Sequence, residues 1–427
     1  MSRELLNTTL GVYFPAFFCM NLNIPFDFKN LENNNEKQMS TFIHEYIHYL
    51  QDITTTYGYM NMSHSVKIIQ VYLNKVAIDE NLNIKLPKSF NDVENAEERN
   101  YQISIFTGDY EYTQSCYIDC IKYKDDDLYK EFFGEGNENI EKCKKIELHY
   151  HSNSTYSTYN FGSMCIMESM AYMIESHIYP DEVRYNEFPY NTCELVTRFI
   201  YPEFAKIKKN IVALCDVSLM TQNPGETFYM LLCYMESIKM MPSDVTEIYD
   251  LALINLHPNY LKDFNLEVLN AQDEINFLYP EDQEFTQNIN IFLKKIVSEA
   301  SDVRKNKCGY FSKLMEMDKD NSIKFIFTDI IPKFALPVIV DKNFNLYMYN
   351  NNDLDLTLFL VVKALYDLFL NIKTGFKCYL FEICDKISDL CNENCLNSPW
   401  KMSEREPLCP FAQFWYRFSL EGKELID

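Results

Sequence analysis

The order of apolar and polar residues along the chain predicts a mainly helical N-terminal region that opens with a little β structure. Residues 10–28 alternate aromatic and small apolar side chains, which indicates one or two strands. A polar stretch over residues 30–36 leads into a helical pattern over about 37–56, and a second helix is expected over about 63–76. Gly58 follows the first pattern closely and is expected to end that helix.

The middle of the chain predicts a strand followed by a second strongly apolar helix. Residues 145–151 carry an apolar residue at every second position, which is typical of a strand. After a stretch rich in serine, threonine and asparagine, Gly162 opens a helical pattern that reaches about Tyr179 and that Pro180 closes. We expect this helix to be buried because few of its residues are polar.

The remainder of the chain is predicted to be mostly helical. Helical patterns cover about residues 194–222, 226–241, 243–256 and 281–316. One hairpin is expected, with strands at 337–340 and 345–349 around a turn at 341–343. The apolar stretch 354–370 contains charged residues, so it predicts a buried helix rather than a membrane span. The whole pattern predicts a mainly α fold with a small β element, an α+β protein.

Composition supports this expectation and narrows the function. The chain has 31 Tyr and 31 Phe but only 10 Gly, and few glycines favour long helices over many tight turns. A net charge of −23 makes nucleic acids and anionic membranes poor partners. Fourteen cysteines without an export signal are typical of reduced thiols, so we expect a soluble, cytoplasmic protein.

The segment over residues 40–52 carries the candidate chemistry. His44 and His48 lie four residues apart, and on a helix this spacing puts both imidazoles on one face, able to share one ion. Zinc suits neutral imidazole and keeps a coordination position for water in catalytic sites. Glu45 lies beside this face, where it can take a proton from that water as a general base.

The residues around the two histidines predict that this helix is buried. Phe42, Ile43, Tyr46, Ile47 and Leu50 make it apolar nearly all round. Buried histidines need polar partners, and one metal ion would serve both rings.

The segment His44-Glu45-Tyr46-Ile47-His48 resembles the HExxH zinc peptidases, the zincins. A metzincin would need Gly and His where Gln51 and Thr54 stand, and the inverted HxxEH order is absent. The resemblance is therefore to the gluzincin type, similar to thermolysin, in which a Glu on a later helix completes the site. It implies a zincin-like core over residues 1–190, followed by a mostly helical accessory region with one β-hairpin over residues 191–427.

Glu168 is the expected third ligand, because a lone carboxylate in so apolar a helix needs a partner. Glu175, two turns later, is its rival, and His64, His177 or an Asp are further alternatives. Tyr172 stands where the thermolysin pattern has an Asp that supports a ligand histidine.

Other residues of the chain are expected to complete the site. Gln51 or Asp52 is expected to support a ligand histidine in place of the thermolysin Asp. The resemblance also implies an edge strand for the substrate backbone, either 145–151 or part of 10–22. It further implies a residue that stabilises the oxyanion. Candidates for that residue are His149, Tyr150, His151, Tyr172 and His177.

Several cysteines crowd the last fifty residues, and a structural zinc held by them is the less favoured interpretation. Their spacing lacks paired CxxC knuckles, so buried reduced thiols in a helical core are expected. The cysteines are Cys378, Cys384, Cys391, Cys395 and Cys409.

Together these features predict a zinc metallopeptidase with one Zn²⁺, held by His44, His48 and Glu168, with Glu45 as the catalytic base. A large helical region predicts restricted access, and thus a narrow range of protein or peptide substrates or a regulatory protein partner. A bacterial effector of narrow specificity fits that description. Two alternatives stay open: a scaffold or binding protein that the metal only staples, and a zinc hydrolase of non-peptide substrates.

Overall fold

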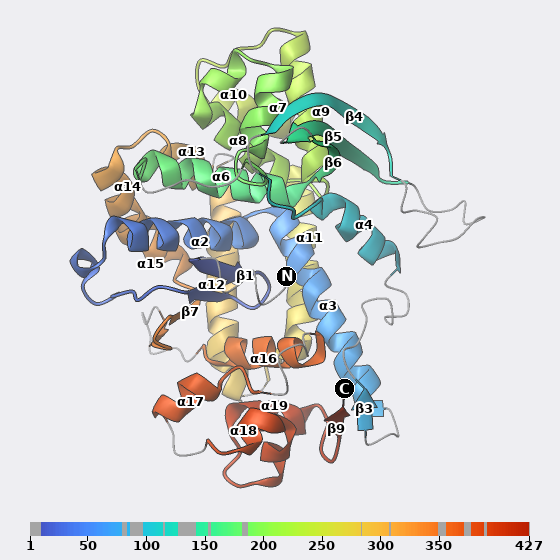
Figure 1. Cartoon of the computed structure of the whole chain (residues 1–427), viewed down its shortest axis with the longest axis vertical. Helices are drawn as coiled ribbons and strands as arrows, with labels where there is room; N and C mark the ends of the chain where they lie inside the picture. Colours follow the sequence, from blue (N-terminus) through green and yellow to red (C-terminus); the bar gives the residue numbers. More distant parts are fainter. Residues whose placement is uncertain are drawn as a thin grey trace.

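A computed structural model gives the fold of the chain. It describes residues 10–78, 83–85, 97–113, 116–126, 142–152, 155–181, 187–282, 284–306, 309–348, 356–370, 377–387 and 391–426. The fold is mainly helical with small sheets, as the sequence pattern predicted (Figure 1).

The first long helix, α2 (Glu36–Thr54), matches the helix predicted over 37–56 and carries the HExxH segment. It begins at Asn35, whose side chain accepts a hydrogen bond from the backbone N–H of Gln38. The Gln38 side chain in turn accepts one from the backbone N–H of Asn35, which completes a capping box. Every residue of α2 from Met39 to its end is buried, as the apolar pattern predicted.

The second long helix, α3 (Thr56–Ile78), follows α2 after the single residue Thr55. Gly58 was expected to end the first helix, but it lies in the first turn of α3 instead. A Cβ atom at Gly58 would lie 2.1 Å from the backbone oxygen of Asp52. Because glycine has no side chain, the two helices can meet at this close distance.

The helix predicted from Gly162 to about Tyr179 is α6 (Ser163–Ile178), and it packs against α2. Its start lies against the end of α4 (Glu97–Thr107), where a Cβ at Gly162 would lie 2.6 Å from the backbone oxygen of Phe106. In Figure 1, α6 and α2 run across the middle of the molecule, one above the other. Their facing sides enclose the candidate site.

Short strands from both halves of the chain form a four-stranded sheet beside α2. The order is β1-β2-β7-β8, with β1 and β2 antiparallel, β2 and β7 parallel, and β7 and β8 antiparallel. The predicted hairpin therefore exists as β7 and β8, and β7 joins it to the N-terminal strands. The strands are β1 (Gly11–Phe14), β2 (Cys19–Leu22), β7 (Val338–Asp341) and β8 (Leu346–Tyr347).

A second, antiparallel sheet lies at the upper right in Figure 1. Its middle strand contains the strand predicted at 145–151. The strands are β4 (Cys116–Asp125), β5 (Lys144–Ser152) and β6 (Thr155–Phe161). A further pair, β3 (Asn83–Lys85) and β9 (Glu424–Ile426), joins the end of the chain to the segment after α3.

Helices make up most of the chain after residue 190. They are α7 (Thr192–Ile200), α8 (Lys208–Leu219), α9 (Pro224–Ser237), α10 (Thr246–Tyr249), α11 (Tyr260–Leu278), α12 (Gln287–Lys305), α13 (Tyr310–Leu314), α14 (Lys319–Phe325), α15 (Ile331–Phe334), α16 (Leu358–Leu370), α17 (Phe381–Ile387), α18 (Asn394–Asn397) and α19 (Pro410–Arg417). Short 3-10 and π-helical turns link several of them.

Two of the long helices predicted in this half are broken. The pattern over 194–222 forms α7 and α8, because Pro202 between them has no N–H to continue a helix. The pattern over 281–316 forms α12 and α13, which are separated around Gly309. α11 was not predicted, and it packs along α3.

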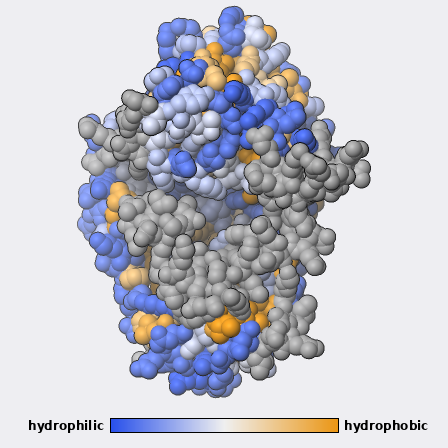
Figure 2. Space-filling view, turned by 45° about the vertical axis from the view of Figure 1, so that its right-hand side comes forward, coloured by the Kyte–Doolittle hydropathy of each residue, from blue (hydrophilic) through white to orange (hydrophobic). Residues whose placement is uncertain are grey.

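The C-terminal helices α16 to α19 lie at the lower end of the molecule in Figure 1, below α2. α12 runs from this end toward the upper half and contacts α2 on the way. On the face in Figure 2 the described surface is mostly hydrophilic, in keeping with the net charge of −23. Among the described helices, none is both long and apolar enough to cross a bilayer.

Candidate metal centre

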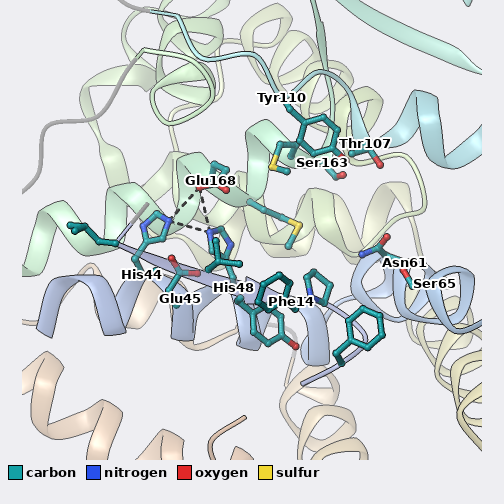
Figure 3. A pocket seen from close by; sticks show the side chains of 18 of the residues that line it. Phe14, His44, Glu45, His48, Asn61, Ser65, Thr107, Tyr110, Ser163 and Glu168 are labelled. Carbon is teal, nitrogen blue, oxygen red and sulfur yellow. Dashed lines mark hydrogen bonds and ion pairs between the residues drawn. The ribbon is translucent and has the colours of Figure 1, made fainter. Parts of the chain in front are cut away.

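Three of the predicted residues meet between α2 and α6. His44 and His48 point from α2, and Glu168 points from α6, into the same small space (Figure 3). The Nε2 atoms of the two histidines lie 3.1 Å apart. Glu168 Oε2 lies 3.3 Å from the first and 3.4 Å from the second. Among the described residues, this is the group whose ligand atoms are close enough to hold one metal ion.

In each neutral imidazole the proton is on Nδ1, because Nδ1 donates a hydrogen bond. Both Nε2 atoms therefore carry a lone pair. His48 Nδ1 lies 2.8 Å from Gln51 Oε1, which can only accept a hydrogen bond, so Nδ1 is the donor. The Gln51 amide donates to the backbone oxygen of Met167, and this fixes its orientation. His44 Nδ1 likewise lies 2.9 Å from a carboxylate oxygen of Glu175.

Two imidazole lone pairs and a carboxylate oxygen therefore converge at short distances, and only a positive charge between them makes this favourable. Burial lowers the pKa of His44, but hydrogen bonds to Glu168 and Glu175 outweigh it and hold that pKa well above its usual range. Burial also opposes the charge on Glu168, but the two histidines hold the pKa of its carboxyl well below its usual range. Either protons or a metal ion can supply the positive charge.

The distances favour the metal ion. In a tetrahedral zinc site with bonds of about 2.0–2.1 Å, two ligand atoms lie about 3.3 Å apart. The three distances measured here are 3.1, 3.3 and 3.4 Å. The separations of the two histidines and Glu168 therefore match those of three ligands in such a site, and all three side chains line the cavity.

Glu175, the rival third ligand, lies behind His44 rather than in the ligand group. Its side chain is almost completely buried, and it supports the ring that it contacts. Gln51 does the same for His48, as one of the two sequence alternatives predicted. Asp52, the other alternative, accepts hydrogen bonds from the Tyr13 hydroxyl and from a backbone N–H instead. Burial raises the pKa of Asp52 to about 7.

The remaining alternatives for the third ligand lie elsewhere. His177 Nε2 is 2.8 Å from the backbone oxygen of Met317. His64 lies on α3 and is not among the described residues that line the cavity at the metal group.

Glu45 lies next to the metal group and lines the same cavity. Burial raises the pKa of its carboxyl, whereas the neighbouring His44 charge and a backbone hydrogen bond from Tyr13 act in the opposite direction. A Cβ at Gly11 would lie 2.7 Å from Glu45 Cγ. The lack of a side chain at Gly11 therefore lets β1 lie directly over the Glu45 carboxylate.

The cavity has a volume of about 910 Å³ and extends well beyond the metal group. In Figure 3 it runs from His44 and Glu45 past Phe14 to Asn61 and Ser65. Of the two segments considered as an edge strand, the one over 10–22 supplies β1 to the cavity wall, and β5 supplies none of the lining residues that the structure describes.

None of the residues predicted to stabilise an oxyanion is among the described residues of the cavity wall. For example, His149 contacts Glu147 and Tyr156 on the β4-β5-β6 sheet. Two tyrosines that were not predicted, Tyr112 and Tyr190, line the cavity together with the metal group. Nothing in the local sequence marked these two, because loops from distant parts of the chain bring them to the site.

The Tyr112 and Tyr190 rings are 6.1 Å apart, and the Tyr190 ring is 6.1 Å from the ring of His44. Burial raises the pKa of Tyr112, and the negative charges of Glu168 and Glu45 add to this effect. The Tyr112 hydroxyl is thus kept as a neutral donor.

Comparison of the chain with protein-family models, with curated proteins and with solved structures gives no match. The site is therefore interpreted from its own geometry.

Proposed function

We propose that this chain is a zinc-dependent metallopeptidase that hydrolyses peptide bonds in a narrow range of protein targets. The observation that carries the proposal is the tetrahedral spacing of His44 Nε2, His48 Nε2 and Glu168 Oε2, with the Glu45 carboxylate in the same cavity. Two nitrogens and one oxygen from the protein form a ligand set typical of catalytic zinc.

Zinc bound here would polarise a substrate carbonyl and lower the pKa of a water molecule. Glu45 would accept a proton from that water and donate it to the departing amine. The approach of Gly11 and the backbone N–H of Tyr13 hold the Glu45 carboxylate in place for both steps. Glu175 and Gln51 keep the two histidine rings in the tautomer that binds metal.

The cavity wall supports a peptide as the substrate. In the described part of the chain, β1 pairs on one side only, with β2, and its residues line the cavity. An extended peptide can add to such an edge through backbone hydrogen bonds. Tyr112 is the residue that we assign to stabilise the oxyanion, because it lines the same cavity as Glu45 and Glu168 and its hydroxyl is a neutral donor.

Restricted access supports a narrow target range. The cavity is lined by residues of β1, α2, α3, α6 and α16, which come from opposite ends of the chain. A cavity walled by so many elements favours a target that offers an extended segment over the surface of a folded protein.

Digestion of a proteome-derived peptide library, read by mass spectrometry, tests the proposal. We expect the zinc-loaded wild type to cleave a restricted group of peptides. Glu45→Gln is expected to keep one zinc per chain and to lose cleavage by at least about a hundredfold, because the general base is removed. His149→Ala, which changes a histidine outside the cavity, is the control and is expected to cleave like the wild type.

A wild type that binds zinc but cleaves no peptide would contradict the peptidase assignment. That result would favour the view that the metal only staples α2 to α6. Equal cleavage by the wild type and Glu45→Gln would contradict the role assigned to Glu45.

A further inference from the structure

A charged pair lies in the wall of the cavity away from the metal group. Lys363 and Asp367 come from α16, a helix that is otherwise almost entirely apolar. Lys363 is only 4 % exposed, and its Nζ donates to both carboxylate oxygens of Asp367, at 2.6 Å each. Burying a charge such as that of Lys363 is costly, and an apolar residue would pack this helix as well. Packing alone therefore does not explain why this charged pair is present.

The two members of the pair are not equally accessible. The Lys363 Nζ lies over the rings of Phe14, at 4.1 Å, and Tyr379, at 5.1 Å. Its side chain is 5 % exposed, whereas the side chain of Asp367 is 27 % exposed. A carboxylate offers roughly four lone-pair positions, and Lys363 occupies only two of them. Asp367 can therefore accept further hydrogen bonds from a molecule in the cavity, while Lys363 is shielded from it.

Strand β1 runs from the metal group to the charged pair. Gly11, at its start, lies against Glu45, and Phe14, at its end, lies against Lys363. Three residues of strand span roughly 10 Å. In Figure 3, Phe14 likewise lies between the metal group and the far end of the cavity. A peptide extended along β1, with its scissile bond at Glu45, would bring a side chain roughly three residues away to the pair.

We propose that Asp367, held in place by Lys363, determines specificity by binding a basic side chain of the substrate peptide, lysine or arginine, roughly three residues from the scissile bond. This assignment rests on the proposed function. A cationic donor makes stronger hydrogen bonds to a carboxylate than a neutral donor does. An acidic side chain would meet the oxygens of Asp367, because the Lys363 charge is enclosed by aromatic rings.

Peptide hydroxamates test this assignment, because the hydroxamate anchors each peptide at the metal without any need for cleavage. One series carries the hydroxamate at the C-terminal end of the peptide, and a second series carries it at the N-terminal end. In each series, lysine, norleucine or glutamate replaces each of the four residues next to the hydroxamate in turn. Isothermal titration calorimetry with the zinc-loaded protein gives Kd for each. We expect lysine to bind roughly tenfold more tightly than norleucine at one position, and glutamate more weakly than norleucine.

Asp367→Asn keeps the shape of the side chain and is expected to abolish this preference while norleucine peptides bind as before. The double variant Lys363→Met with Asp367→Leu removes both charges together, so it leaves no unpaired charge, and it is expected to show the same loss. Lys37→Met, at another charged residue of the cavity wall, is the control and is expected to keep the preference.

Equal Kd values for lysine and norleucine at every position would overturn the assignment, and so would a lysine preference that persists in Asp367→Asn. A zinc-loaded protein that discriminates among the hydroxamates but cleaves no peptide would support the assignment and reject the peptidase activity. A protein that binds neither zinc nor any hydroxamate would overturn both proposals.

Discussion

At the scale of single residues, the two ligand histidines are held from behind by different partners. A carboxylate of Glu175 accepts from His44, and a neutral amide of Gln51 accepts from His48. The carboxylate makes its imidazole the more basic ligand, whereas the amide only fixes the ring.

Gly11 gives a prediction at this scale. In Gly11→Ala the new methyl group would lie 2.7 Å from Cγ and 2.8 Å from Oε1 of Glu45, so the flexible end of that side chain must move. We expect kcat to fall by about ten- to a hundredfold, because displacement of the base by roughly 1 Å is costly. Zinc content measured on the same sample is expected to stay at one ion per chain. An unchanged kcat would contradict the close contact of β1 with the base.

The sequence predicted the residues of the site whose geometry is local. His44, Glu45 and His48 lie on one turn of helix, so their spacing alone places them together. Glu168 was predicted because a carboxylate in an apolar helix needs a partner. Tyr112, Tyr190 and Asp367 were not, because only the tertiary fold brings them to the cavity.

At the scale of secondary-structure elements, the HExxH helix is fixed at its C-terminal end by a buried ion pair. Arg304, from α12, donates to Asp216, from α8, at 2.8 and 3.1 Å, and also to the last backbone oxygen of α2, that of Thr54. A cation at this end of a helix also interacts favourably with the helix dipole. Both charged side chains are fully buried.

Loss of this cation is expected to destabilise the fold strongly. Arg304→Met leaves Asp216 buried without its charge partner, so we expect the free energy of unfolding to fall by about 3–5 kcal/mol in urea denaturation. The matched control is Arg198→Met, which breaks an exposed i,i+4 pair with Glu194 and is expected to change stability little. A similar small effect from both variants would show that the buried pair does not anchor α2.

The sequence patterns gave the order of the elements better than their ends. α2 and α6 were predicted closely because a polar stretch precedes α2, and Gly162 and Pro180 flank α6. The 194–222 pattern failed at Pro202, where apolar periodicity continues across a break in the backbone hydrogen bonds. α11 lacked so clear a signal, and its contact with α3 is what holds it in place.

At the scale of the whole molecule, the two halves of the chain build one cavity. β7 pairs with β2, and α16 brings Lys363 and Asp367 to the wall of the cavity that also holds the metal group. The pairing of segments more than three hundred residues apart in sequence is invisible to local patterns. It explains why the sequence predicted the metal group but not the rest of the cavity.

The account depends on one ion between α2 and α6, so metal analysis tests it most directly. We expect elemental analysis of the purified wild type to find one zinc per chain. The ion is expected to be absent from the His44→Ala, His48→Ala double variant, depleted in Glu168→Ala and retained in the control His149→Ala. A wild type without stoichiometric metal, or a double variant that keeps it, would contradict the account.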